Sequence, residues 1–112
     1  MKNQEIFKRQ INGKLPVLVD FYTNQDVTSR TMHTLLKIVA YRLEGAIKVI
    51  SVNMDTNNNQ EIIEQYLQDR VPIFILFQGG EIKWQAAGFF TSRKLVKVLT
   101  KFISSESTLK LE

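Results

Sequence analysis

The stretch Leu15-Pro-Val-Leu-Val-Asp-Phe-Tyr22 is a dense apolar run that combines β-branched and aromatic residues. Such a run is typical of a strand that is buried on both faces, with Pro16 at its edge, where no ladder hydrogen bond is lost. A strand of this kind needs cover on either side. Before it, residues 3–12 place apolar side chains at the spacing of a short amphipathic helix, which Gly13 ends.

After this strand, apolar residues recur with the period of a helix of about four turns, and Gly45 ends the pattern. These residues are Met32, Leu35, Leu36, Val39, Ala40 and Leu43. Residues 46–54 (AIKVISVNM) then predict a second strand, and residues 60–68 predict a short helix with one apolar face.

A hairpin follows, in which residues 73–77 and 81–87 are strands joined by a turn at Gly79-Gly80. Alternation along the return strand predicts that Ile82, Trp84 and Ala86 share one side. Thr91 is a candidate N-cap for a last helix, whose apolar residues continue to Ile103. We expect the polar tail, residues 104–112, to be frayed.

The predicted order of elements is therefore α-β-α-β-α-β-β-α. A helical crossover between the first two strands implies a parallel pair, and the tight turn between the last two implies an antiparallel pair. The simplest solution is an α/β fold with a mixed four-stranded sheet flanked by helices on both faces. We expect a single domain over residues 1–112, with its core at about 15–103.

Composition excludes several kinds of chemistry. The chain has 112 residues and no cysteine, so it has no disulfide, no thiolate nucleophile and no sulfur-ligated metal. A single histidine, His33, cannot supply a site with several histidine ligands. We therefore expect no metal and no cofactor.

The formal net charge of +4 is mildly basic and favours no nucleic-acid partner strongly. The N-terminus shows no signal-peptide pattern and no apolar run is long enough to cross a membrane, so we predict a cytoplasmic protein without a membrane partner. The terminal Leu111-Glu112 pair resembles a cloning remnant and is left out of the fold prediction.

Four segments together resemble the thioredoxin family, and the resemblance covers residues 15–103. They are Pro16-Val-Leu-Val-Asp20-Phe21-Tyr22, the strand that leads into the family's active site; Val49-Ile-Ser-Val-Asn53-Met54-Asp55, the next strand; Arg70-Val71-Pro72-Ile73, the loop with the family's cis-proline; and Phe77-Gln-Gly79-Gly80-Glu81 with Ala87-Gly88, the hairpin and the glycine after it. The resemblance implies a thioredoxin-like fold that lacks the strand often found before the first helix.

The same resemblance places the family's Cys-Gly-Pro-Cys motif on Asp26-Val27-Thr28-Ser29. Thiol–disulfide exchange needs one thiolate to attack a disulfide and a second thiol to resolve the mixed intermediate. Neither Asp26 nor Ser29 can do this, so we predict a redox-inactive protein, although similarity alone suggests a thiol–disulfide oxidoreductase. Asp26 is either only a helix cap or also a carboxylate that a partner recognises.

Asp20 corresponds to the buried acid of the resembling enzymes, where it accepts a proton from the resolving thiol. Ser29 stands in place of that thiol, and Ser51 in place of a lysine often found near the acid. We expect Asp20 to be a polar core residue bonded to hydroxyls or water, without a role in proton transfer. Burial with no cation nearby predicts that its pKa lies above the ordinary value of about 3.9.

The resemblance also implies a shallow binding groove at this corner. Its residues would be Gln25, Val27, Val71, Pro72, Gly88 and Phe89. In the family, the cis-proline loop that Val71-Pro72 matches offers backbone groups to an extended peptide. Phe89 stands where the family usually has a small residue. It is either an exposed apolar anchor or folds over the space of the family tryptophan that Gln25 replaces.

Two further features, His33 and a basic stripe on the last helix, are expected to have structural roles only. His33 is expected to be a solvated helix residue, and we do not expect it to form a hydrolase pair with Ser29. A basic stripe on the last helix is expected to be a solvated polar face. Its residues are Arg93, Lys94, Lys97 and Lys101.

The leading functional hypothesis is a protein- or peptide-binding or adaptor module that uses the groove, with a partner that the sequence does not identify. The sequence shows no nucleophile and no set of metal ligands that would support an enzyme of another kind. Binding of nucleic acid or anionic lipid through the basic stripe is the remaining alternative.

Overall fold

The computed structural model describes residues 3–66 and 73–111, with side chains up to Ile103, and its elements follow the predicted order. They are α1 (Asn3–Ile11), β1 (Val17–Tyr22), α2 (Val27–Arg42), β2 (Lys48–Asn53), the 3-10 turn η1 (Asn57–Asn59), α3 (Gln60–Tyr66), β3 (Ile73–Gln78), β4 (Glu81–Ala87) and α4 (Ser92–Leu111). Among the described helices, none combines the length and the apolarity that a membrane span requires.

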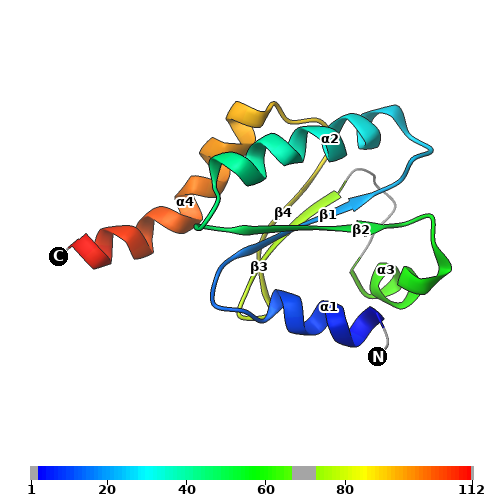
Figure 1. Ribbon diagram of the computed structural model, residues 1–112, viewed down its shortest axis with the longest axis horizontal. Helices are drawn as coiled ribbons and strands as arrows, with labels where there is room; N and C mark the ends of the chain where they lie inside the picture. Colours follow the sequence, from blue (N-terminus) through cyan, green and yellow to red (C-terminus); the bar gives the residue numbers. More distant parts are fainter. Residues whose placement is uncertain (1–2, 67–72, 112) are drawn as a thin grey trace.

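The four strands form one mixed sheet in the order β2-β1-β3-β4. β1 pairs in parallel with β2 and antiparallel with β3, and β3 pairs antiparallel with β4. Figure 1 shows α1 and α3 on one face of the sheet and α2 and α4 on the other. The predicted fold class is thus confirmed, and β1 is an inner strand covered on both faces.

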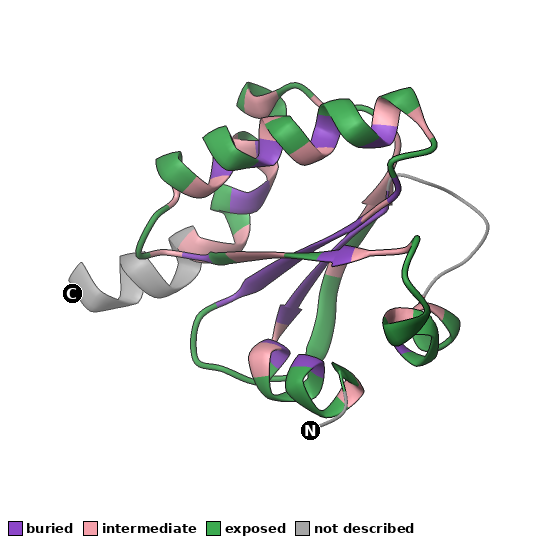
Figure 2. Ribbon diagram, turned by 45° about the vertical axis from the view of Figure 1, so that its right-hand side comes forward, coloured by how far each residue is buried: buried purple, intermediate pink, exposed green. Residues whose placement is uncertain are grey.

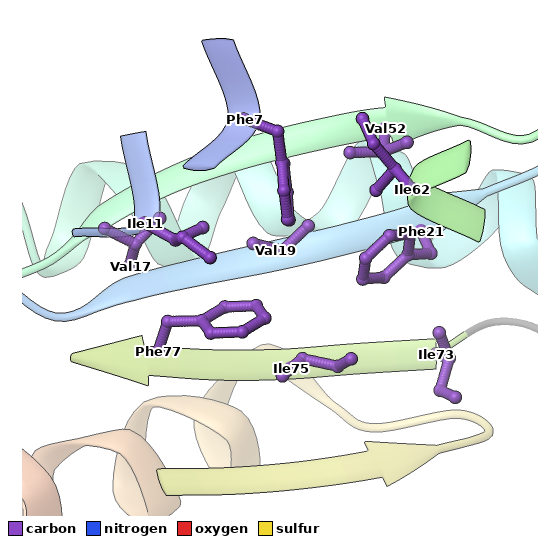
Figure 3. Close-up of a cluster of buried hydrophobic side chains, with 10 residues drawn as sticks. All are labelled: Phe7, Ile11, Val17, Val19, Phe21, Val52, Ile62, Ile73, Ile75 and Phe77. Atoms are coloured by element: carbon purple, nitrogen blue, oxygen red, sulfur yellow. The ribbon is translucent and has the colours of Figure 1, made fainter. Parts of the chain in front are cut away.

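Successive side chains of β1 and β3 point to opposite faces of the sheet, so both strands contribute to two separate cores. Val17, Val19 and Phe21 point to the face covered by α1 and α3, where Phe7 and Ile62 meet them (Figure 3). The intervening residues contribute to the core beneath α2 and α4. That second core contains Leu18, Phe74 and Leu76 from the strands, Met32, Leu36 and Val39 from α2, Ile47, and Leu95 and Leu99 from α4. Figure 2 shows the buried residues concentrated on the inner strands and on the inward sides of the helices.

Two local expectations are wrong. A register shift at Leu76/Phe77 pairs Ile82 with Phe77 but Trp84 with Leu76, so Ile82 and Trp84 oppose residues of different cores and do not share a side. The predicted frayed tail is instead helical in its backbone, because α4 runs to Leu111. Residues 104–111 contain neither glycine nor proline, so nothing in the sequence breaks the helix there.

α1 packs on the sheet through two buried side chains, Phe7 and Ile11, of which Phe7 makes the aromatic contacts. Phe7 is 3% exposed, and its ring centroid lies 6.2 Å from that of Phe21, 5.5 Å from that of Tyr66 and 5.9 Å from that of Phe77. These tilted and edge-on arrangements are the favoured ones for aromatic pairs. Phe7 therefore links α1, β1, α3 and β3.

We expect Phe7→Ala to lower the free energy of unfolding by about 3–5 kcal/mol, because it removes a buried ring and leaves a cavity. Lys8→Ala, at the exposed neighbouring position, should change it by less than about 0.5 kcal/mol. Urea denaturation of both variants measures the difference. Equal effects would mean that α1 is not docked through Phe7.

Candidate functional site

The strand register brings several chain segments together at one edge of the sheet. Tyr22, at the end of β1, pairs with Asn53 at the end of β2. Phe21 pairs with Ile73 at the start of β3, which pairs in turn with Ala87 at the end of β4. Residues 23–29, which follow β1, and residues 88–91, which follow β4, therefore leave the sheet at the same edge. We call these two segments the corner.

The start of α2 is capped by Asp26. Its backbone is extended, with φ −124° and ψ 128°, and its Oδ2 accepts a hydrogen bond from the backbone N–H of Ser29 at 2.8 Å. A carboxylate in this position satisfies an otherwise unpaired helix donor and interacts favourably with the helix dipole. Asp26 thus caps the N-terminus of α2, as one of the two interpretations of this residue expected.

Ser29 lies inside the protein. Its side chain is fully buried, and its Oγ accepts a hydrogen bond from the backbone N–H of Thr23 at 2.9 Å. The hydroxyl therefore ties the loop after β1 back to α2 and is not accessible as a nucleophile. Val27, in the same motif, is 67% exposed, whereas Thr28 is half-buried.

Asp55, just after β2, holds the loop from its other side. Its Oδ1 accepts a hydrogen bond from the Thr23 hydroxyl at 2.6 Å, and its Oδ2 accepts one from the backbone N–H of Asn24 at 2.9 Å. These two hydrogen bonds hold the pKa of Asp55 below its ordinary value of 3.8. The Arg30 guanidinium also donates to the carbonyl of Asn24, at 2.7 Å. Hydrogen bonds that involve no sulfur therefore order residues 23–29 of the corner.

Asp20 is fully buried beneath α2, and beside a hydroxyl partner of the predicted kind it has a partner that was not predicted, His33. Its Oδ2 lies 2.8 Å from Nδ1 of His33 and 3.4 Å from the Ser51 hydroxyl, while its Oδ1 is buried without a hydrogen-bond partner. The interpretation of His33 as a solvated helix residue is wrong. Its side chain is only 32% exposed and stacks on Tyr22, with ring centroids 3.8 Å apart. No hydrolase-like pair forms, because Ser29 and His33 bond to other groups.

Burial raises the pKa of the Asp20 carboxyl above 3.8. The cost of desolvating the charge exceeds the opposing effects of the His33 hydrogen bond, the His33 charge and the Ser51 hydrogen bond. The direction agrees with the prediction, but the prediction assumed no cation nearby. A carboxylate can only accept hydrogen bonds, so Nδ1 of His33 carries a proton whenever Asp20 is ionised.

The segment after β4 exposes Phe89 and buries Phe90. Gly88 has φ +101°, a conformation that favours glycine, and it redirects the chain toward α2. Phe90 then packs edge-on against Phe74 and Trp84, and its backbone N–H lies 3.4 Å from the sulfur of Met32. Phe89 is 57% exposed, so of the two alternatives for this residue the exposed one holds. Phe90, not Phe89, fills the space beside Trp84.

The remaining residues of the predicted groove are Gln25, Val71 and Pro72. Gln25 is exposed, and its side-chain amide lies 3.5 Å from Oδ1 of Asp55. Val71 and Pro72 lie outside the described residues, so the cis-proline remains a prediction. Within residues 3–66 and 73–103, no group of three or more acidic or histidine side chains could hold a metal ion.

Sequence reasoning missed the partnership of Asp20 with His33, although a signal was present. His33 follows the buried Ser29 by four residues, so both side chains lie on the same face of α2. That face covers the even-numbered side of β1, to which Asp20 points. The Thr23–Asp55 bond gave no local signal, because it joins residues 32 positions apart.

Comparison with known proteins gives consistent results. The family model described as Thioredoxin matches residues 1–101. Thioredoxin from the alga Pyropia yezoensis is 32% identical over 99 residues, covering 88% of this chain and 91% of that protein. Thioredoxin 1 from Nostoc sp. is 30% identical over 98 residues, covering 87% and 90%. Thioredoxin Y1, chloroplastic, from Arabidopsis thaliana is 31% identical over 87 residues, covering 78% of this chain but 49% of that protein.

The two perturbed carboxyls predict opposite effects on stability. The raised pKa of Asp20 means that the native state holds this proton more tightly than the unfolded chain. Its favourable contribution is complete below the ordinary pKa and is lost as the pH rises through the raised value. Asp20→Asn should therefore be more stable than the wild type at neutral pH, with a gain that shrinks toward about pH 4.

Asp55→Asn is the matched control. The pKa of Asp55 is lowered, so its contribution is present above the ordinary pKa and is lost as the pH falls through the lowered value. This variant should be less stable than the wild type at neutral pH. Denaturation of both variants between about pH 4 and 8 tests the pair, and a loss of stability in Asp20→Asn at neutral pH would contradict the account of Asp20.

Proposed function

The chain belongs to the thioredoxin family and contains no cysteine, and from these two facts we propose that it binds extended polypeptide at the corner without exchanging disulfides. None of its 112 residues can form the thiolate that attacks a disulfide or the thiol that resolves the intermediate. What the chain retains is an ordered corner at the sheet edge. We expect it to act in the cytoplasm as a binding or adaptor module.

The observation that carries the proposal is the exposure of two apolar side chains at this ordered corner. Val27 is 67% exposed and Phe89 is 57% exposed. The bond of Phe90 to Met32 holds the segment that bears Phe89 against α2, about one and a half helical turns from Val27. Exposed apolar groups on a rigid support are typical of contact sites for partners.

An extended peptide is the occupant that fits this position best. The family resemblance implies that the loop containing Val71 and Pro72 offers backbone groups to such a peptide, and Ile73 directly after it begins β3 at the same edge. Backbone pairing is independent of sulfur. Phe89 would then contact an apolar side chain of the peptide, so the site would prefer peptides that have an apolar residue at that position.

Introducing two cysteines at positions 26 and 29 tests whether the chain lacks only the thiols that disulfide exchange requires. The double variant Asp26→Cys/Ser29→Cys should form a reversible disulfide and catalyse insulin reduction, whereas the wild type should not. The thiol introduced at position 26 replaces an acceptor that now lies 2.8 Å from the backbone nitrogen of Ser29, where a thiolate is stabilised. Insulin turbidity with dithiothreitol measures both proteins.

Activity in the wild type would contradict the proposal that exchange is absent. A double variant that folds but forms no disulfide would contradict the placement of the motif at residues 26–29. The single variant Asp26→Cys serves as the control, because it has an attacking thiol and no resolving one.

Phe89→Ala tests the binding surface directly. Peptides selected from a displayed random library on the wild type should bind the variant about tenfold more weakly, because the exposed ring is lost from the contact. Tyr41→Ala is the matched control, since Tyr41 is 78% exposed near the opposite end of α2. Fluorescence anisotropy measures the affinities. A library that yields no binding peptide, or equal affinities for Phe89→Ala and the wild type, would overturn the proposal.

A further inference from the structure

Resting on the proposed function, we infer that the peptide bound at the corner carries an acidic segment, which docks on the adjacent basic face of α4. This basic face consists of Arg93, Lys94, Lys97 and Lys101. These residues line a surface hollow of about 530 Å³ together with Thr91 and Val98. Thr91, which lines the hollow, follows Phe89 by two positions in the chain.

The excess positive charge of the chain is located on this face. Between Ser92 and Ile103 the sequence has these four basic residues and no acidic one. All other positions together carry eleven basic and eleven acidic residues, so the formal net charge of +4 equals that of the basic face. A concentration of like charge within three helical turns attracts an anionic partner and speeds its association.

Among the described side chains, no acidic group pairs with these four cations. The described part of the chain has two ion pairs, His33 with Asp20 and Lys83 with Glu81, and neither involves the basic face. The Lys94 ammonium lies instead 5.6 Å from the centre of the Phe90 ring. Carboxylates of a partner could therefore pair with this face without displacing any described acidic group.

The occupant that fits best is a peptide, because no aromatic ring lines the hollow and Phe89 is the one exposed ring of the corner, whereas a run of bases would need several. The nearest ring, that of Phe90, is packed against Phe74 and Trp84. Binding sites for single-stranded nucleic acid combine cations with aromatic stacking platforms. A membrane surface also fits poorly, because the apolar side of α4 is buried through Leu95 and Leu99.

Continuity between the two surfaces supports a single ligand. Phe90 joins them, because its backbone bonds to Met32 on α2 and its ring faces Lys94 on α4. A peptide with an apolar side chain against Phe89 and acidic residues on one side of it would reach Lys94 first, then Lys97 and Lys101. Positions 94, 97 and 101 follow one side of the helix at spacings of three and four residues.

The test uses two labelled synthetic peptides of about twelve residues, a length that bridges both surfaces when extended. Each has a central Leu-Phe pair, followed by four glutamates in one peptide and four glutamines in the other. The wild type should bind the glutamate peptide about tenfold more tightly, with a preference that decreases as the salt concentration rises from about 0.05 to 0.5 M. Lys94→Gln/Lys97→Gln/Lys101→Gln should abolish the preference.

The matched control is Arg9→Gln/Lys14→Gln/Lys48→Gln, which removes three positive charges around another hollow, at the start of β1 and β2. This variant should keep the preference. Phe89→Ala should weaken the binding of both peptides and leave the ratio of their affinities unchanged, because Phe89 lies at the corner and not on the basic face.

Equal affinity of the wild type for both peptides would overturn the inference and leave the proposed function standing. Loss of the preference in the control variant would also overturn it, since net charge would then explain the result. Oligothymidylate that binds the wild type more tightly than the glutamate peptide and loses affinity in the α4 variant would overturn it in favour of nucleic acid. Failure of both peptides to bind would count against the inference and the proposed function together.

Discussion

The strand β1 has helices over both of its faces, and this constraint governs the rest of the molecule. Each side chain of an inner strand with two covered faces must be apolar or must find a polar partner. Val17, Leu18, Val19 and Phe21 satisfy the rule by packing in the two cores, and the half-buried Tyr22 stacks on His33. Asp20 cannot do so, and its burial requires the contacts with His33 and Ser51.

The corner shows how a helix N-terminus can be satisfied without the sulfur chemistry of the family. The backbone donor at Ser29 needs an acceptor, and the carboxylate of Asp26 supplies one. The interior needs a small polar group that holds the loop after β1, and the Ser29 hydroxyl supplies it. Ordinary capping and one buried hydroxyl therefore account for the order of this part of the corner.

The fold was predictable because the apolar periods of the sequence are local and strong. The dense apolar run in residues 15–22 specifies a strand buried on both faces, and the helical repeat from Met32 to Leu43 specifies a helix and its buried side. The bulge near Ile82 was not predictable, because it depends on pairing between two strands, which neither strand reveals alone. The polar composition beyond Ile103 does not by itself predict the helical backbone found there, although helix formation needs no apolar residue at every turn.

The site was predictable in part. Resemblance placed the motif at residues 26–29, where Asp26 caps α2, but the ion pair of Asp20 depends on how α2 lies across β1. A consequence follows from the buried Ser29 hydroxyl and the Asp26 cap. Because the chain has no cysteine, the corner cannot alternate between a disulfide form and a dithiol form that would differ in affinity. Departure of a bound chain would be governed by its concentration and by competitors, as in an ordinary reversible equilibrium.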